Sequence, residues 1–292
     1  MAKTRVLVKR RKAIRNIRKI TRTMELIATA RFKKAFDRAV AADAYTRKIT
    51  ELAADLSASA TDIKHPLLEK RETIKNSLLL VICSNRGLCG GYNASILREA
   101  NTAIRAIKAQ GSNLRLELSG KRAIAYFRYQ GIPAETTYTQ FEDKPRFEEI
   151  EEVADRYIAA YTSGAVDQVQ VCYMKFQSAS KQAPAIAQLL PLEPVAADAA
   201  KDKPAAKIEY EYVPDPKDIL EEILPVAFKV RLFKTFLDAA VSEQIARRVA
   251  MKAATENAGD MIKLLTRQYN RARQAQITKE IAEVIGGVEA LK

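Results

Sequence analysis

Residues 226–285 read VAFKVRLFKTFLDAAVSEQIARRVAMKAATENAGDMIKLLTRQYNRARQAQITKEIAEVI, with a single glycine, Gly259, and no proline. Such a stretch predicts one long helix, because glycine and proline are the residues that most disfavour a helix interior. Residues 3–57 also lack both residue types. At 1.5 Å per residue, about 60 residues would form a rod on the order of 90 Å long. We therefore expect the longest rigid elements at the two ends of the chain, as a rod with a compact domain on its side.

Both predicted helices carry residues at alternating spacings of three and four, which keeps one seam facing a partner helix. In the first helix we place this seam at Ile17, Ile20, Met24 and Ile27, and then at Ile49, Leu52 and Leu56. In the last helix it passes through Val226, Val230, Phe233, Leu237, Ala240, Gln244, Arg247, Met251, Ala254, Ala258, Met261 and Leu265. Neither helix can bury its seam alone, so we expect a slender antiparallel pair.

The middle of the chain alternates short β-rich runs with helical stretches, which is typical of an open α/β sheet. We expect strands at 77–84, 114–118, 134–138, 166–176, 186–190 and 208–213, and helices that end near Ala109 or span 121–129 and 147–161. The predicted fold class is α/β: a long antiparallel coiled coil of the N- and C-terminal helices with an inserted Rossmann-like α/β domain. The predicted segments are 1–60, 75–213 and 217–292.

Two proline positions and one polar segment are expected to interrupt the regular structure. His65-Pro66 is expected to end the first helix, since a proline disfavours the helical conformation of the residue before it. Residues 193–207, rich in Ala, Asp, Lys and Pro, are predicted to be a mobile linker. Pro225 removes a backbone donor, so the last helix either begins near Leu224 or bends there.

The chain is basic, with 49 Lys and Arg against 35 Asp and Glu and a formal charge of +14. Fourteen of the basic residues lie between Lys3 and Arg38, where only Glu25 and Asp37 oppose them, so this segment carries +12. A charge concentrated on one helix predicts an acidic partner, a membrane surface or nucleic acid.

The sequence offers little for catalysis. His65 is the only histidine, and Gly87, Gly90 and Gly91 do not have the spacing of a phosphate-binding loop. Three cysteines argue against a disulfide framework and for a reducing compartment. The longest apolar run, residues 78–83, is far shorter than the ~20 residues of a membrane-spanning helix. We expect no catalytic residue, no cofactor, no metal and no transmembrane segment.

Three stretches carry a resemblance to a known family. They are Ile17–Lys33 (IRKITRTMELIATARFK), Ser84–Asn93 (SNRGLCGGYN) and residues 242–291, from SEQIARRVAMK to GGVEAL. Together they resemble the γ subunit of the F-type rotary ATP synthase, and the third stretch is the most specific. The resemblance covers both ends and the middle of the chain.

This resemblance implies a rotor shaft that transmits torque between a membrane c ring and a catalytic hexamer of α and β subunits, driven by proton flow, with the ε subunit beside it. The phosphoryl chemistry would belong to the β subunit. The implied partners are thus the α, β and ε subunits and the c ring, with no nucleic acid. The implied location is peripheral, on the cytoplasmic face of a bacterial plasma membrane.

The resemblance also implies contact residues for the β subunit. Arg273 and Gln274 match positions that hydrogen-bond a loop of β, and Thr278, Glu280 and Glu283 match positions nearby on the same helix. Met24 and Arg247 match positions near a lower contact with β, where the basic first helix would face acidic loops. No insertion with paired cysteines is present, which speaks against the thiol-regulated form of chloroplasts.

Two other interpretations stay open from the residues themselves. A basic coiled-coil protein that binds nucleic acid would explain the charge, and predicts salt-sensitive binding to DNA. A Rossmann-like enzyme with helical arms would explain the α/β pattern, and predicts tight nucleotide binding by the isolated chain.

Overall fold

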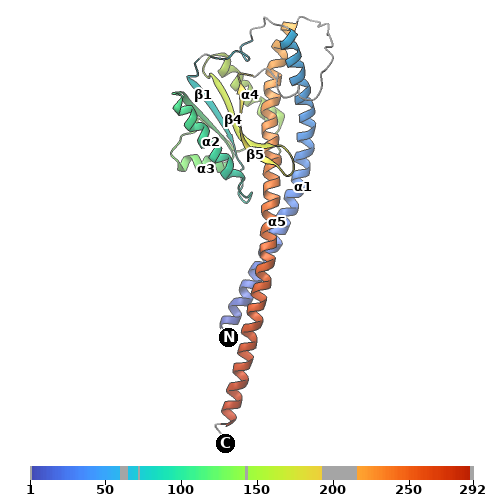
Figure 1. Cartoon of the computed structure of the whole chain (residues 1–292), viewed down its shortest axis with the longest axis vertical. Helices are drawn as coiled ribbons and strands as arrows, with labels where there is room; N and C mark the ends of the chain where they lie inside the picture. Colours follow the sequence, from blue (N-terminus) through green and yellow to red (C-terminus); the bar gives the residue numbers. More distant parts are fainter. Residues whose placement is uncertain (1, 60–64, 72, 142–143, 193–215, 290–292) are drawn as a thin grey trace. The chain divides into compact units, whose positions relative to one another are not determined.

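A computed structural model describes residues 2–59, 65–71, 73–141, 144–192 and 216–289 (Figure 1). The chain divides into two compact units. The two-helix unit consists of Met1–Thr29 and Arg247–Lys292, and the mixed unit consists of Ala30–Ala246. Helices α1 (Ala2–Ser59) and α5 (Pro216–Glu289) contribute residues to both units.

In the two-helix unit, α1 and α5 run antiparallel, as predicted. The hydroxyl oxygens of Thr21 and Thr255 lie 2.8 Å apart, within hydrogen-bonding distance. The Arg11 guanidinium lies over the ring of Tyr269, 4.9 Å from its centroid. Residue numbers therefore fall along α5 as they rise along α1, which is the pairing expected of two helices that return on each other.

Of the predicted seam of α1 in this unit, only Met24, which is half-buried, is confirmed. Ile17, Ile20 and Ile27 are 47%, 59% and 48% exposed, so these three isoleucines lie on the outer surface of the pair. The buried and half-buried positions of this part of α1 are Thr4, Leu7, Arg11, Ile14, Thr21, Met24, Glu25 and Ala28. From Thr4 to Ile14 they follow alternating steps of three and four residues, and Ile14, Thr21 and Ala28 are seven apart. From Thr21 to Ala28 the buried positions are small, which lets two helix axes approach closely.

The same correction applies further along α1. Leu52 is exposed, and the side chain of Leu56 lies outside the described residues, whereas Ile49 is half-buried. In the mixed unit α1 instead buries alanines, Ala35 and Ala39, against α5. The alanine-rich region, which had the weaker apolar pattern, thus provides the packed face.

The predicted seam of α5 is largely confirmed. Its buried members are Val230, Leu237, Ala240, Gln244, Arg247, Met251, Ala258 and Leu265, and its half-buried members are Val226, Phe233 and Ala254. The prediction that Met261 lies on the seam is wrong, because Met261 is 49% exposed while its neighbour Ile262 is half-buried. The seam steps four residues from Ala258 to Ile262 and then three to Leu265, so the order of steps differs from the predicted order.

The mixed unit is built on a five-stranded sheet with the order β3-β2-β1-β4-β5. Its strands are β1 (Asn76–Ile82), β2 (Asn113–Ser119), β3 (Thr136–Tyr138), β4 (Gln168–Phe176) and β5 (Gln182–Leu190). The first four are parallel, and β5 pairs antiparallel with β4. Each lies where a strand was predicted, although β5 begins four residues earlier. The predicted strand at 208–213 and the predicted linker at 193–207 lie outside the described residues.

Helices cover both faces of the sheet (Figure 1). Helices α2 (Tyr92–Ala109) and α3 (Lys121–Tyr129) pack on one face, and α4 (Phe147–Thr162) and α5 pack on the other. The run in β1 explains this arrangement, because a central strand with apolar side chains on both sides needs cover on both faces. Leu79 and Val81 face α2, whereas Leu78 and Leu80 face α4 and α5.

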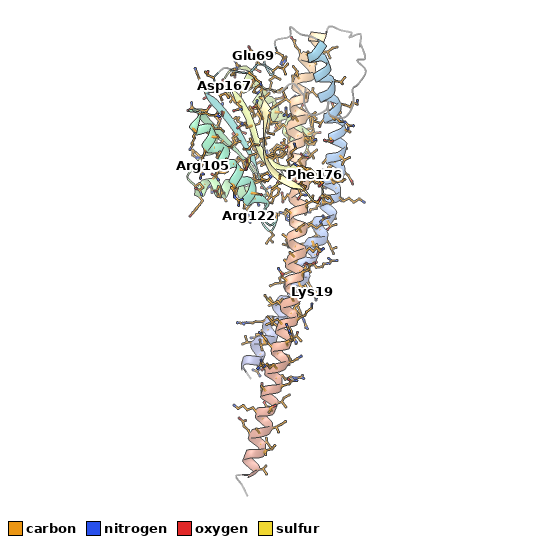
Figure 2. The ribbon with its side chains drawn as sticks, in the orientation of Figure 1. Lys19, Glu69, Arg105, Arg122, Asp167 and Phe176 are labelled. Atoms are coloured by element: carbon orange, nitrogen blue, oxygen red, sulfur yellow. The ribbon has the colours of Figure 1, made fainter. Side chains whose placement is uncertain are left out.

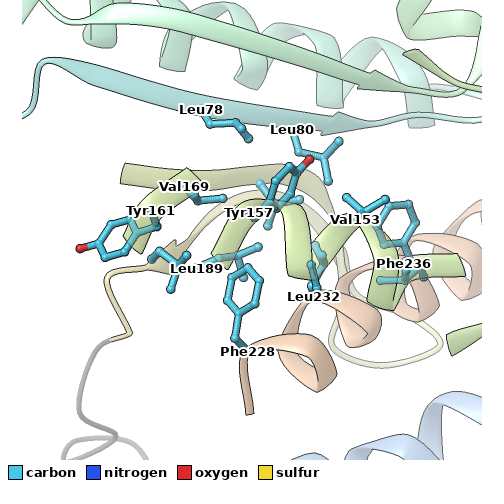
Figure 3. Close-up of a cluster of buried hydrophobic side chains, with 14 of the residues drawn as sticks. Leu78, Leu80, Val153, Tyr157, Tyr161, Val169, Leu189, Phe228, Leu232 and Phe236 are labelled. Atoms are coloured by element: carbon cyan, nitrogen blue, oxygen red, sulfur yellow. The ribbon is translucent and has the colours of Figure 1, made fainter. Parts of the chain in front are cut away.

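Helix α5 is part of the sheet's core and does not merely flank it. Figure 3 shows Phe228, Leu232 and Phe236 of α5 beside Tyr157 of α4 and Val169 of β4. All five side chains are buried. Fully burying one such apolar side chain contributes roughly 1.5–3 kcal/mol. The single predicted seam of α5 missed this second buried face.

Pro225 neither starts nor ends α5. The helix begins at Pro216, where a proline is well tolerated, and continues through Pro225. A proline inside a helix lacks the N–H that would bond to the carbonyl four residues before it, here that of Glu221. Nearby Leu224 and Phe228 are buried, so the packing of this segment offsets the missing bond. The division into segments 1–60, 75–213 and 217–292 stays a prediction.

Gly120, between β2 and α3, provides a test of the fold. Its φ is +97°, and a Cβ atom there would lie 2.1 Å from the carbonyl oxygen of Cys83. Gly131 also has a positive φ, +69°, but faces open space. We expect Gly131→Ala to lower the free energy of unfolding by about 1 kcal/mol, the cost of a left-handed alanine. Gly120→Ala should cost several times more, as measured by urea denaturation followed by circular dichroism. An equal loss of unfolding free energy in the two variants would mean that the backbone at Cys83 can shift at little cost to make room for the added Cβ atom.

Candidate functional site

All seven predicted contact residues lie in the two-helix unit. Arg273, Gln274, Thr278, Glu280 and Glu283 occupy the last turns of α5, and each is exposed. Their side chains are therefore available to a partner. No observation of this structure tests whether a partner binds them, so their role stays a prediction.

The other two predicted contact residues are less accessible. Met24 on α1 is half-buried, and Arg247 on α5 is only 8% exposed. A buried arginine is normally held by internal partners. Arg247 is buried because it lies on the seam of α5. A side chain that fills the seam leaves little of its surface for contact with a partner.

Two of the predicted residues line one hollow. Arg273 and Glu280 are seven residues apart, which is two helical turns, and therefore lie on the same face of α5. With residues of both helices they line a cavity of about 230 Å³, whose lining residues are Thr4, Arg5, Tyr269, Arg273, Gln276, Ile277 and Glu280. The side-chain amide of Gln276 donates a 2.9 Å hydrogen bond to Glu280 Oε1. Gln274 and Thr278, four residues apart, share a neighbouring face.

A strongly basic hollow lies further along the pair. It has a volume of about 1200 Å³ and is lined by Lys12, Arg15, Asn16, Arg18, Lys19, Arg22, Thr23, Thr255 and Ile262. No acidic residue lines it, and Lys19 extends from α1 in Figure 2. Five cationic side chains in one concave surface attract carboxylates or phosphates. The +12 segment is thus gathered in space as well as in sequence.

The sequence reasoning missed a set of exposed apolar side chains in this unit. They are Ile17, Ile20, Leu26 and Ile27 on α1, and Met261, Leu264, Ile277, Ile281, Val284, Ile285 and Val288 on α5. Exposed apolar residues that gather on one surface commonly mark a surface that a partner covers. Apolar periodicity alone gave no signal for the outer position of the isoleucines, because it placed them on the seam.

The glycine-containing loop after β1 is closed by its own side chains. Asn85 Oδ1 accepts a 3.0 Å hydrogen bond from the backbone N–H of Lys121, and the carbonyl of Ser84 accepts one from Arg122. These are the first donors of α3, which in nucleotide-binding folds bind phosphate. The guanidinium of Arg122 covers Gly87, where an added Cβ would lie 2.8 Å from its nitrogen. The geometry therefore disfavours a phosphate at this helix end.

A buried polar cluster elsewhere in the mixed unit is also satisfied internally. The carboxylate of Glu117 accepts hydrogen bonds from the hydroxyls of Tyr138 and Tyr157, at 2.7 and 2.6 Å, and pairs with Arg156 at 2.7 Å. Burial, with the added effect of the Glu117 charge, raises the pKa of Tyr138 and of Tyr157. Both hydroxyls thus stay protonated donors, and the cluster holds α4 on the sheet.

The cysteines are buried thiols. Burial raises the pKa of Cys83 well above its usual value and that of Cys172 to about 12. A thiol is nucleophilic only as its thiolate, so both are unreactive near neutral pH. Among the described residues, no three His, Cys, Asp or Glu side chains gather as a metal site would require. Nor does any helix in the described ranges combine the length and apolar character needed to cross a bilayer.

The fold is that of solved central-stalk subunits of rotary ATP synthases. A chain in the Euglena gracilis mitochondrial ATP synthase, in its OSCP/F1/c-ring assembly, matches with a TM-score of 0.66 and 17% identity, over 99% of this chain and 95% of that one. A chain of the rotor of the same enzyme matches with a TM-score of 0.64 and 18% identity, over 94% of this chain and 99% of that one.

The sequence comparisons are more specific. A family model described as ATP synthase matches residues 3–291. The ATP synthase gamma chain of Rhodopirellula baltica is 55% identical over 295 residues, and that of Leptospira biflexa is 42% identical over 291 residues. Each match covers the whole of both chains. The chain therefore belongs to the ATP synthase gamma chain family.

The seam that positions the candidate contact residues can be tested by volume. Ala28 is fully buried between the helices, whereas the adjacent Ile27 is exposed. We expect Ala28→Leu to lower the free energy of unfolding by about 1–3 kcal/mol, because added methylenes overpack a close contact. Ile27→Ala should change it by less than about 0.5 kcal/mol. Thermal and urea unfolding of both variants would measure this, and a larger loss for Ile27→Ala would contradict the observed seam.

Proposed function

We propose that this chain is the central rotor shaft of an F-type ATP synthase, transmitting torque between a membrane c ring and a catalytic hexamer of α and β subunits. Its membership of the gamma chain family carries this proposal. The paired helices support it mechanically, since the hydrogen bonds and packing of a continuous helix resist twisting. The shaft would press the three β sites through different conformations as it turns.

The packing of α5 supports a firm connection between helix and sheet in the mixed unit. Phe228, Leu232 and Phe236 are buried in the core under the sheet, while Leu237 and Val241 pack toward α1. A helix buried on two sides cannot turn about its own axis without exposing one of its apolar faces. Force applied to the mixed unit would therefore reach α5 rather than be lost in slippage.

The last turns of α5 would meet the β subunit. Arg273 and Gln274 are exposed and would hydrogen-bond a loop of β, with Thr278, Glu280 and Glu283 close by. Further along the helix pair, toward the mixed unit in the sequence of α1, the basic hollow and Met24 would face acidic loops of β. Arg247 would add to this lower contact only through the small exposed part of its side chain. The exposed apolar residues of both helices would slide within a sleeve formed by the hexamer.

The chain itself would carry no catalytic residue, cofactor or metal. The closed loop at Ser84 and Asn85 supports this, because the helix end that could bind phosphate is already bonded. Phosphoryl transfer would take place on the β subunits. The ε subunit and the c ring complete the proposed partners, and the proposed location is peripheral, on the cytoplasmic face of a bacterial plasma membrane.

One observation favours a second candidate function. The basic hollow on α1 offers five cationic side chains that could also bind the phosphates of nucleic acid. Such binding would be independent of sequence and would weaken steeply with salt. Saturable DNA binding at physiological salt would favour this candidate. The full-length family match, by contrast, supports the rotor.

Reconstitution is the first test. We expect the chain alone to be inert toward MgATP, and to form a stoichiometric complex with cognate α and β subunits that hydrolyses ATP in steady state. Hydrolysis would be measured for the α and β mixture with and without the chain. Failure to form any complex with cognate subunits would overturn the rotor proposal.

The contact residues can be tested within that complex. Replacing Arg273 and Gln274 together by Ala should weaken assembly or coupling torque without unfolding the chain. A charge-assisted hydrogen bond contributes roughly 1.5–3 kcal/mol, so loss of one predicts about a tenfold or larger effect. Torque on single assembled molecules and subunit affinity would be measured.

The matched control for this test is Gln268→Ala with Arg271→Ala, the same residue types at exposed positions of the same helix. We expect this control to behave like the unmodified chain. Unchanged assembly and turnover in the Arg273 and Gln274 variant would show that the proposed contact is wrong.

A further inference from the structure

A separate hollow of the mixed unit lies where α1, the end of β4 and α5 meet. Its volume is about 300 Å³, which is the lower end of the range for small-ligand sites. The residues that line it are Ala39, Val40, Asp43, Phe176, Gln177, Lys234 and Asp238, and Phe176 is labelled in Figure 2. None of them was singled out by the sequence pattern or by the proposed function.

The unusual group in this hollow is the carboxyl of Asp238. It is 5% exposed, and within the described parts of the chain its side chain has neither a hydrogen bond nor an ion pair. Its oxygens are not among the fully enclosed, unpartnered polar atoms of the described residues, so they remain accessible from the hollow. A carboxyl without a protein partner that opens into a cavity can pair with a cationic ligand there.

The charged neighbours of Asp238 either form an ion pair with another residue or act on it only through their charge. Lys234, one helical turn before it on α5, forms an ion pair with Asp43 of α1 at the rim. From β4, the charge of Lys175 also acts on Asp238, and the charge of Asp238 in turn contributes to raising the pKa of Tyr173. The hollow thus holds two carboxylates and one ammonium when Asp238 is ionised, an excess of one negative charge.

The protonation of Asp238 agrees with an empty cation site. Burial raises its pKa to about 7; Lys234 and Lys175 act in the opposite direction, and Asp43 adds to the rise. The folded-state pKa is above the ordinary value, so the neutral carboxyl prevails below about pH 7. A cation that entered the hollow would stabilise the carboxylate and release a proton.

We propose that this hollow binds one organic cation, an alkylammonium or guanidinium group on a short apolar stem, with Asp238 as its counter-ion. The apolar stem would contact Ala39, Val40 and Phe176, and an aromatic ring also attracts a cation at close range. A metal ion fits less well, because only two carboxylates reach the hollow and no three metal-binding side chains gather among the described residues. This site does not depend on the rotor role of the chain.

n-Butylguanidine, a guanidinium on a four-carbon apolar stem, is a suitable probe. We expect saturable one-to-one binding to the full chain by isothermal titration at pH 7. Titration in two buffers of different ionisation enthalpy should show release of about half a proton per site, since a group with a pKa near 7 is half protonated there. N-butylurea, which has a similar shape without the charge, should bind at least tenfold more weakly.

Variants connect the binding to this hollow. Asp238→Asn should weaken n-butylguanidine binding at least tenfold and abolish the proton release. Asp260→Asn is the matched control on the same helix, where the carboxylate is exposed and pairs with Lys263, and it should bind as the unmodified chain does. Val40→Trp, at an exposed rim position, should narrow the hollow and weaken binding even if Asp238→Asn folds poorly. Equal binding to all of these, or no saturable binding at all, would overturn the proposal.

The same titration on a complex with the α, β and ε subunits identifies the source of the cation. If n-butylguanidine still binds and releases a proton, the natural ligand is a small molecule. If binding is seen only with the isolated chain, a basic side chain of a partner subunit occupies the hollow. Both outcomes require the site, whereas an isolated chain without proton-linked binding excludes it.

Discussion

The close approach of α1 and α5 is the constraint on which the rest of the structure depends. Ala28 in the two-helix unit, and Ala35 and Ala39 in the mixed unit, are buried because there is no room for larger side chains. Small residues bury little apolar area each, so the pair gains its stability from many weak dispersion contacts along its length. The large isoleucines are displaced to the outer surface, which makes that surface apolar and available.

In the mixed unit this constraint is combined with a second one. Here α5 has to satisfy α1 on one side and a parallel sheet on the other, so nearly every position from 235 to 245 is buried. A sheet covered by two helices on each face is a stable arrangement without any ligand. The sheet therefore works as an anchor for a helix.

Most of the fold could be predicted from the sequence, because its signals are local. The scarcity of glycine and proline predicted the two helices, and the apolar run of β1 predicted a strand covered on both faces. The seam of α1 could not be predicted from apolar periodicity, since Ile17, Ile20 and Ile27 compete with a heptad of small residues that only the partner helix selects. Likewise, Met261 and Ile262 are equally apolar, and the phase of the pairing decides between them.

The candidate site was less predictable than the fold. Exposed positions such as Arg273 and Gln274 have no local signal, and only family resemblance marked them. The seam periodicity placed Arg247 at a buried position, whereas the family resemblance made it a contact residue, and its 8% exposure agrees with the seam. The hollow around Asp238 depends on three elements more than 50 residues apart in the sequence, so no spacing along the chain could reveal it.

The closed loop at the start of α3 has a thermodynamic consequence. A ligand that binds only the folded state raises its stability in proportion to the logarithm of ligand concentration. Asn85 and Ser84 already accept hydrogen bonds from the first two backbone N–H groups of α3, so these groups are not free to bind ATP or phosphate. Nucleotide or phosphate should therefore add no stability to the mixed unit through this helix end.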